Sequence, residues 1–127
     1  MRKAFFLTLA LLATPAAART VLLVDDDTIK IDGVTIRLLD IDTPESFRSR
    51  RECELVLALK AKERLRQLLD GGPVTYAPTG FDRYRRTLAR VYAGNVDVSR
   101  KLLDEGHALP YVPGPMAKAT RLAAWCP

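Results

Sequence analysis

Histidine and cysteine are scarce in this chain, and their scarcity excludes several kinds of site. Among 127 residues there are one histidine and two cysteines, with no C-x-x-C pair. A structural zinc site takes four cysteine or histidine ligands, so the chain is poorly supplied for one. We interpret His107, near the end of a predicted helix, as a surface or capping residue rather than a catalyst. The sequence also lacks G-x-S-x-G and a P-loop, which leaves no nucleophilic serine elbow and no phosphate-cradling glycine loop.

Membrane-spanning apolar runs are absent as well. The apolar run at residues 4–13 falls short of the ~20 residues that cross a bilayer. It follows two basic residues and precedes a stretch of small residues that ends at Ala18, which is the order of a secretory signal. The sequence therefore predicts a signal peptide over residues 1–18, cleaved after Ala18, in preference to a membrane anchor. We expect one exported domain over residues 19–127, periplasmic or secreted, with no stable membrane insertion.

The charge balance is modestly basic. Loss of the signal peptide removes two positive charges, so the formal net charge falls from +5 to +3 (5 − 2). A basic domain is a plausible partner for a polyanion such as nucleic acid, although many exported domains are basic without binding one.

The two cysteines, Cys53 and Cys126, have two possible states. In an oxidising compartment a disulfide between them is favoured, and it would tie the C-terminal tail to the middle of the domain. The alternative is a pair of buried free thiols.

Hydrophobic periodicity predicts an α+β domain. Asp32-Gly33 between two apolar runs is a strong hairpin signal, and Gly71-Gly72-Pro73 ends a long amphipathic helix. The predicted strands are 20–24, 28–31, 34–39, 74–77 and 87–92, and the predicted helices are 52–69, 97–105 and a short one through Leu122. Five short strands with about three helices fit a five-stranded OB-type β-barrel. Nothing in the sequence indicates a dimer, so we expect a monomer.

Acidic residues gather in the segment 24–45, whose apolar residues otherwise predict strands. In an extended segment alternate side chains share a face, so Asp25 and Asp27 are expected to point together and Asp26 away. Carboxylates on a rigid hairpin suit a hard cation, and the spacing does not match an EF-hand loop. The candidate ligands and proton acceptors are Asp25, Asp27, Asp42 and Glu45. The alternative is a solvated, repulsive turn.

Arginines near these carboxylates suggest the chemistry. Arg37 lies in an otherwise apolar strand, and the charged segment 79–86 supplies further arginines, including Arg86. Guanidinium groups bind phosphate and stabilise charge that develops on it. Glu45 is suited to take or orient a proton of water. Together these residue types indicate metal-assisted attack of water on a phosphodiester.

Three motifs carry a resemblance to a known family. They are V-D-D-D-T (24–28), I-R-L-L-D-I-D-T-P-E (36–45) and D-R-Y-R-R-T-L-A-R-V (82–91). In this order and spacing they resemble the signature blocks of the staphylococcal nuclease-like domains, or thermonucleases. The resemblance extends over about residues 21–111 and implies an OB-type barrel with three helices.

The resemblance also implies an activity and its residues. The activity is calcium-dependent endonucleolytic hydrolysis of DNA and RNA. The implied roles are Asp27, Asp42 and the Thr43 carbonyl as Ca²⁺ ligands, Arg37 and Arg86 as phosphate-binding arginines, Glu45 as the water-activating carboxylate, and Tyr84 and Tyr111 as borders of the nucleotide pocket. For the two tyrosines ordinary packing is the alternative.

The chain departs from the family pattern at two positions. Asp26 and Arg85 each stand where the motifs usually have glycine. If either position needs a positive φ, a side chain there is strained, and arginine tolerates that conformation less well than aspartate. These departures favour a second hypothesis, a catalytically degenerate OB-type module that binds nucleic acid or protein.

Overall fold

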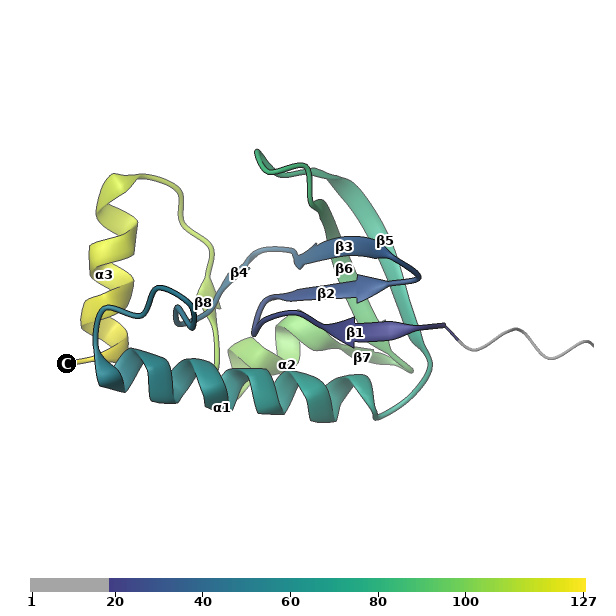
Figure 1. Ribbon diagram of the computed structural model, residues 1–127, viewed down its shortest axis with the longest axis horizontal. Helices are drawn as coiled ribbons and strands as arrows, with labels where there is room; N and C mark the ends of the chain where they lie inside the picture. Colours follow the sequence, from purple (N-terminus) through teal and green to yellow (C-terminus); the bar gives the residue numbers. More distant parts are fainter. Residues whose placement is uncertain (1–18) are drawn as a thin grey trace, which may run out of the picture.

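The protein, seen in a computed structural model that describes residues 19–127, is built around one mixed sheet with three helices (Figure 1). The sheet order is β1-β2-β3-β6-β5, and a short strand, β7, pairs with β6. All pairings are antiparallel except β3 with β6. The strands are β1 (Val21–Leu23), β2 (Thr28–Ile31), β3 (Val34–Leu38), β5 (Val74–Phe81), β6 (Thr87–Ala93) and β7 (Val96–Asp97). The predicted signal peptide lies outside the described residues.

The predicted α+β class and the three helices are confirmed, and the sheet is consistent with an OB-type fold, although it is not closed. A barrel closes only when its two edge strands hydrogen-bond to each other. Here the edges are β1, which is three residues long and pairs only with β2, and β5, which pairs only with β6. Within residues 19–127 the sheet therefore stays open.

The chain leaves the sheet directly after β3. Asp40 has φ 64°, a left-handed conformation that ends the strand. The following strand, β4 (Ile41–Asp42), pairs with β8 (Leu109–Pro110) in a separate two-stranded sheet. Asp42 therefore lies on a short strand outside the sheet that contains β3.

Of two local predictions about strands, one is confirmed and the other is wrong. The hairpin at Asp32-Gly33 is confirmed, with φ values of 48° and 82° that suit a tight turn between β2 and β3. By contrast, β5 does not end at Ala77 but continues through Pro78 to Phe81, with a register shift at Pro78/Gly80. Proline is tolerated there because β5 is an edge strand.

The helices cover one side and one end of the sheet. They are α1 (Glu52–Leu69), α2 (Val98–Asp104) and α3 (Pro115–Trp125). In Figure 1, α1 runs along the sheet with α2 beside it, and α3 stands at the far end of α1. The core consists of apolar side chains that these elements bury between them: Ile29, Ile31, Ile36, Leu38, Leu65, Leu68, Val91, Val98 and Leu102. No helix among the described residues is long and apolar enough to span a bilayer.

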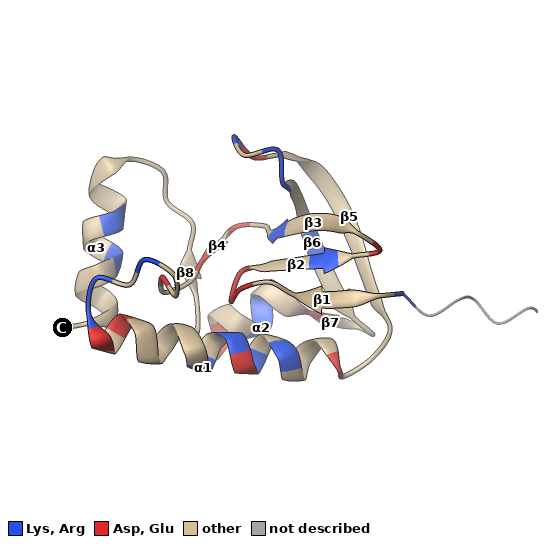
Figure 2. Ribbon diagram, viewed as in Figure 1, with Lys and Arg blue, Asp and Glu red and all other residues tan. Residues whose placement is uncertain are grey.

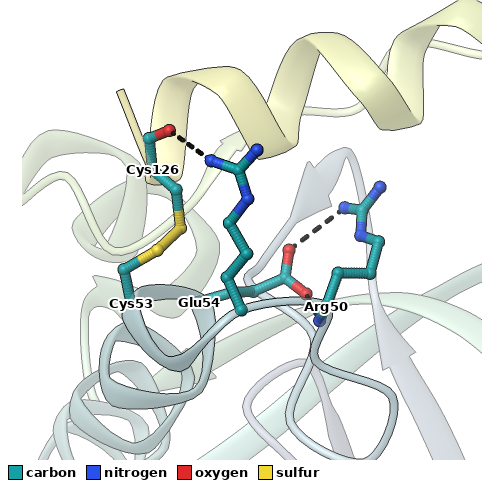
Figure 3. Close-up of a disulfide and its surroundings, with 5 residues drawn as sticks. Arg50, Cys53, Glu54 and Cys126 are labelled. Atoms are coloured by element: carbon teal, nitrogen blue, oxygen red, sulfur yellow. Dashed lines mark hydrogen bonds and ion pairs between the residues drawn. A yellow bond between two sulfur atoms is a disulfide. The ribbon is translucent and has the colours of Figure 1, made fainter.

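A disulfide ties α3 to α1, and this prediction is confirmed. Cys53 in the first turn of α1 is bonded to Cys126, which follows α3 (Figure 3). Beside it, buried Glu54 accepts a hydrogen bond from the Arg50 side chain at 3.1 Å. Since α3 has no buried residue of its own, this bond is a main attachment of the helix to the domain.

Candidate active site

The turn between β1 and β2 gathers three carboxylates. Backbone N–H groups of Val24 and Asp25 both donate to the Thr28 carbonyl at 3.0 Å, which folds residues 25–27 into a bend. Oxygen atoms of Asp25, Asp26 and Asp27 lie within 4.8 Å of one another. The predicted alternation of side chains is wrong, because it holds for an extended strand and this segment is a bend.

Asp26 is the buried member of this group. Its exposure is 1%, and its Oδ2 has no hydrogen-bond partner among residues 19–127. Burial, and then the charges of Asp25 and Asp27, raises the pKa of Asp26 to about 9, although Thr43 opposes the shift. At neutral pH Asp26 is therefore a neutral acid. Its φ is not positive, so a side chain at this position causes no backbone strain.

Asp27 and Arg37 form an ion pair across the β2–β3 hairpin. Arg37 lies opposite Thr28 in the register of the two strands, and its Nε is 3.4 Å from Asp27 Oδ2. Asp27 also accepts a hydrogen bond of 2.7 Å from the Thr28 hydroxyl, while its own carbonyl accepts from the Leu38 N–H. These contacts hold the Asp27 carboxylate beside the guanidinium.

Arg86, the residue just before β6, reaches the same turn. Its Nη1 is 3.4 Å from Thr28 Oγ1, so Thr28 contacts both Asp27 and Arg86. Asp82 orients Arg86, since Asp82 Oδ2 accepts from Arg86 Nε at 2.6 Å and Oδ1 accepts from the Arg86 backbone at 2.9 Å. The two predicted phosphate-binding arginines thus come from β3 and from the β5–β6 connection, and they meet at one Thr–Asp pair.

Asp42 and Glu45 lie close enough to Asp27 to interact with it. Burial raises the pKa of Asp42, while Arg121 and Arg37 lower it and Asp27 raises it, so Asp27 and Asp42 are close enough to interact. Burial likewise raises the pKa of Glu45, with Lys118 opposing and Asp42 and Asp27 adding to the shift. Both carboxyls therefore share one electrostatic environment with Asp27.

Helix α3 contributes two cations that the sequence interpretation missed. Arg121 forms an ion pair with Asp42, and both side chains are largely buried, with 19% and 13% exposed. Lys118 lies near enough to Glu45 to lower its pKa. The two residues are one helical turn apart, which puts them on one face of α3. That spacing was the only available signal, and it does not reveal which partner the face meets.

The two predicted pocket tyrosines lie in different places. Tyr84 is at the tip of the β5–β6 hairpin, with the Arg86 guanidinium 5.5 Å from its ring centre. Tyr111 follows β8, and its backbone N–H donates to the Asp40 carbonyl at 2.9 Å. The rings are 65% and 56% exposed. Tyr84 is therefore joined to the arginine side of the site, whereas Tyr111 is anchored through its backbone.

Arg85, beside Tyr84, adopts a φ of 62°. The position that usually carries glycine does need a left-handed backbone here, as the resemblance implied. For an arginine this costs about 1–2 kcal/mol.

The donor atoms of this site suit a hard divalent cation. Such ions take oxygen ligands from carboxylates and carbonyls, and Asp27 and Asp42 supply two partly buried carboxylates. Thr43 lies next to them, with a buried Oγ1 that has no hydrogen-bond partner. There are no soft ligands at this turn. The residues present therefore fit a cation of the Ca²⁺ type.

Comparison with known proteins identifies the family of this chain. Residues 35–124 match the family described as "Staphylococcal nuclease homologue", so the chain belongs to that family. Arg37, Asp42, Glu45 and Arg86 fall within the matched residues, whereas Asp27 precedes them.

Several curated proteins are similar over part of their length. The chain is 34% identical over 87 residues to "Probable endonuclease LCL3" of Candida tropicalis, covering 65% of this chain and 37% of that protein. It is 31% identical over 98 residues to an "Uncharacterized endonuclease" of Haemophilus influenzae, covering 73% of this chain and 51% of that protein. The chain thus spans between about a third and a half of the length of these relatives.

Proposed function

We propose that this protein is a metal-dependent endonuclease that hydrolyses phosphodiester bonds of DNA and RNA. The observation that carries the proposal is the convergence of Arg37 and Arg86 on Thr28 and Asp27. Two guanidinium groups beside an acidic turn form a site for a phosphate that is also in contact with a cation. The similar proteins are named as endonucleases, which supports the same activity.

The metal in this proposal is Ca²⁺. Asp27, Asp42 and the Thr43 carbonyl would hold it, because oxygen donors of this kind are the ligands it prefers. When bound, Ca²⁺ supplies Lewis-acid stabilisation of negative charge on the phosphoryl oxygens. The fit of the donor set supports this choice.

Arg37 and Arg86 bind the scissile phosphate and offset the charge that builds up during attack. Arg37 is held by Asp27 and by its own hydrogen bond to the Leu38 carbonyl, and Arg86 is held by Asp82. Because both side chains are oriented before substrate arrives, little ordering is required at the reacting phosphate.

Glu45 accepts or orients a proton of the attacking water. Burial raises its pKa above the ordinary value. A carboxylate with a raised pKa is a stronger proton acceptor when it is ionised. This supports Glu45, rather than the better-paired Asp27, as the residue next to the water.

We further propose that the protein acts outside the cytoplasm as a monomer. The signal pattern in residues 1–18 supports export, and the Cys53–Cys126 disulfide is typical of an oxidising compartment.

One observation favours the second candidate, a catalytically degenerate binding module. Arg121 already pairs with Asp42, and a cation bound by Asp42 would compete with it. In a degenerate module this pair would be permanent, and the protein would bind nucleic acid or protein without cleaving.

The test is digestion of a plasmid and of a structured RNA by the purified protein, with Ca²⁺ and with chelator. We expect cleavage only with Ca²⁺, and Arg37→Ala or Arg86→Ala to lower the rate by about 100-fold or more. Arg64→Ala is the matched control, because Arg64 pairs with Glu105 away from this site. Full activity in either site variant refutes the roles, and binding without cleavage in the unmutated protein favours the module.

A further inference from the structure

The tip of the β5–β6 hairpin carries an unusual group of exposed side chains. We call residues 81–86 the basic tip. Figure 1 shows this hairpin projecting beyond the β1–β3 strands, and Figure 2 shows that its end is rich in Lys and Arg. Phe81 and Tyr84 expose 74% and 65% of their surface there, next to Arg83 and Arg85. Exposed aromatic rings between guanidinium groups are suited to nucleotides, which offer both a flat base and a phosphate.

Among the described residues, only one arginine of the basic tip, Arg86, forms an ion pair within the protein. Asp82 is its single carboxylate, and its oxygens are engaged with the backbone of Tyr84 and with Arg86. Within residues 19–127 neither Arg83 nor Arg85 forms an ion pair with an acid. Asp82 thus holds the turn, Arg83 contacts Tyr84, and Arg85 is available to a partner.

Arg85 is the residue that most needs an explanation. It adopts a φ of 62°, a conformation that glycine adopts without strain and arginine does not. Asp82 already organises the turn, and the Arg85 side chain forms no hydrogen bond or ion pair with the residues that the structure describes. Strain that is retained without internal compensation indicates a functional role.

The basic tip is continuous with the proposed active site. Arg86 contacts Thr28 at the acidic turn and also lies 5.5 Å from the Tyr84 ring centre. Arg83 covers the same ring at 4.8 Å and donates to the Tyr84 hydroxyl at 2.7 Å. A chain of groups that bind phosphates and bases therefore leads from the turn to the end of the hairpin.

We propose that the basic tip binds the single-stranded part of a nucleic acid just beyond the cleaved bond, with Arg85 on a phosphate and Phe81 stacked on a base. The partner is single-stranded because only unpaired bases can stack on protein rings. Binding is tolerant of sequence, because every base has a flat face. This inference rests on the proposed function and extends its substrate surface to Arg85 and Phe81.

The test uses the full chain after purification and a fluorescent oligothymidine in chelator, so that binding is measured without cleavage. We expect Arg85→Gly to weaken binding about 5-fold at 0.1 M salt and to reduce the slope of log K against log salt by about 0.7, the value for one lost phosphate contact on a single strand. The same variant should raise Tm by about 2–4 °C, because relief of strain exceeds the added freedom of glycine in the unfolded chain. A variant that is more stable and yet binds less well separates function from folding.

Phe81→Ala should weaken binding about 5-fold or more and leave the salt slope unchanged, since it removes stacking and no charge. Arg66→Ala is the charge-matched control, because Arg66 lies on the exposed face of α1 and its loss changes the net charge equally. A duplex of the same length is measured in parallel, and the tip variants should affect its binding less.

Three results would overturn the inference. The affinity and slope of Arg85→Gly could equal those of Arg66→Ala, or Phe81→Ala could bind normally, or duplex and single strand could lose affinity equally. If the unmutated protein cleaves nucleic acid with Ca²⁺ but the tip variants bind normally, only this inference fails. If the unmutated protein neither binds nor cleaves nucleic acid, the proposed function fails as well.

Discussion

Arg121 provides a sharp prediction about the proposed cation site. Its Nε pairs with Asp42 Oδ2, its Nη1 donates to the Val112 carbonyl at 3.2 Å, and both members of the pair are largely buried. A cation that takes Asp42 must displace this guanidinium. We therefore expect Arg121→Gln to raise the affinity for Ca²⁺.

The magnitude follows from the environment of the pair. Hydrogen bonds that involve charged groups contribute about 1.5–3 kcal/mol each, and the partial burial of this pair limits screening by salt. The cation no longer has to break that interaction in the variant, nor to tolerate a positive neighbour. The affinity should therefore rise about 10- to 100-fold.

The assay is a calorimetric titration of the purified protein with Ca²⁺. The control is Arg64→Gln, which removes a guanidinium that pairs with Glu105, a residue outside the proposed cation site. An unchanged affinity in Arg121→Gln would show that Asp42 is not a ligand. A weaker affinity would show that Arg121 holds Asp42 in the position that the ion needs, and it would refute the competition argument.

Three further predictions concern the disulfide, a buried acid and the proton acceptor. The Cys53–Cys126 bond spans 73 residues, and its loss should lower the stability by up to about 4 kcal/mol. Limited proteolysis of the reduced protein should cut α3 first. If α3 were protected as well as in the disulfide-bonded protein, this prediction would be contradicted. Asp26 is ionised above pH 4 in the unfolded chain but stays protonated to about pH 9 when folded, so stability should fall between these values by up to about 1.4 kcal/mol per pH unit. In chelator, Asp26→Asn should flatten the dependence of Tm on pH, and an unchanged profile would mean that Asp26 is ionised in the fold. Glu45→Gln should lower kcat by about 100-fold or more with little change in Ca²⁺ affinity, and normal turnover would remove Glu45 from the mechanism.

Features that depend on neighbouring residues were predictable from the sequence. The hairpin at Asp32-Gly33 and the bounds of α1 follow from turn chemistry and helical periodicity. The Asp97 cap of α2 is an interaction of the same local kind, since its side chain accepts from the Arg100 N–H. These interactions lie within a few residues along the chain, so a local pattern contains the information they need.

The candidate site was predictable in composition but not in arrangement. The motifs singled out Asp27, Arg37, Asp42 and Arg86, and the structure brings these residues close together. The charge state of Asp26 was not predictable, because it depends on burial in a bend that the strand pattern did not indicate. Strand periodicity also does not reveal whether two edges of a sheet meet, so only the structure shows that this sheet is open.

By itself, the sequence determined the residue types of a cation and phosphate site, most of the helices and strands, and the pair of cysteines able to form the single disulfide. Only the tertiary structure decided that α3, bonded to α1 through Cys126, brings Arg121 to Asp42. The physical reason is that this contact joins two segments far apart in the chain. Such a contact is set by how the elements pack and by the disulfide, neither of which leaves a local pattern.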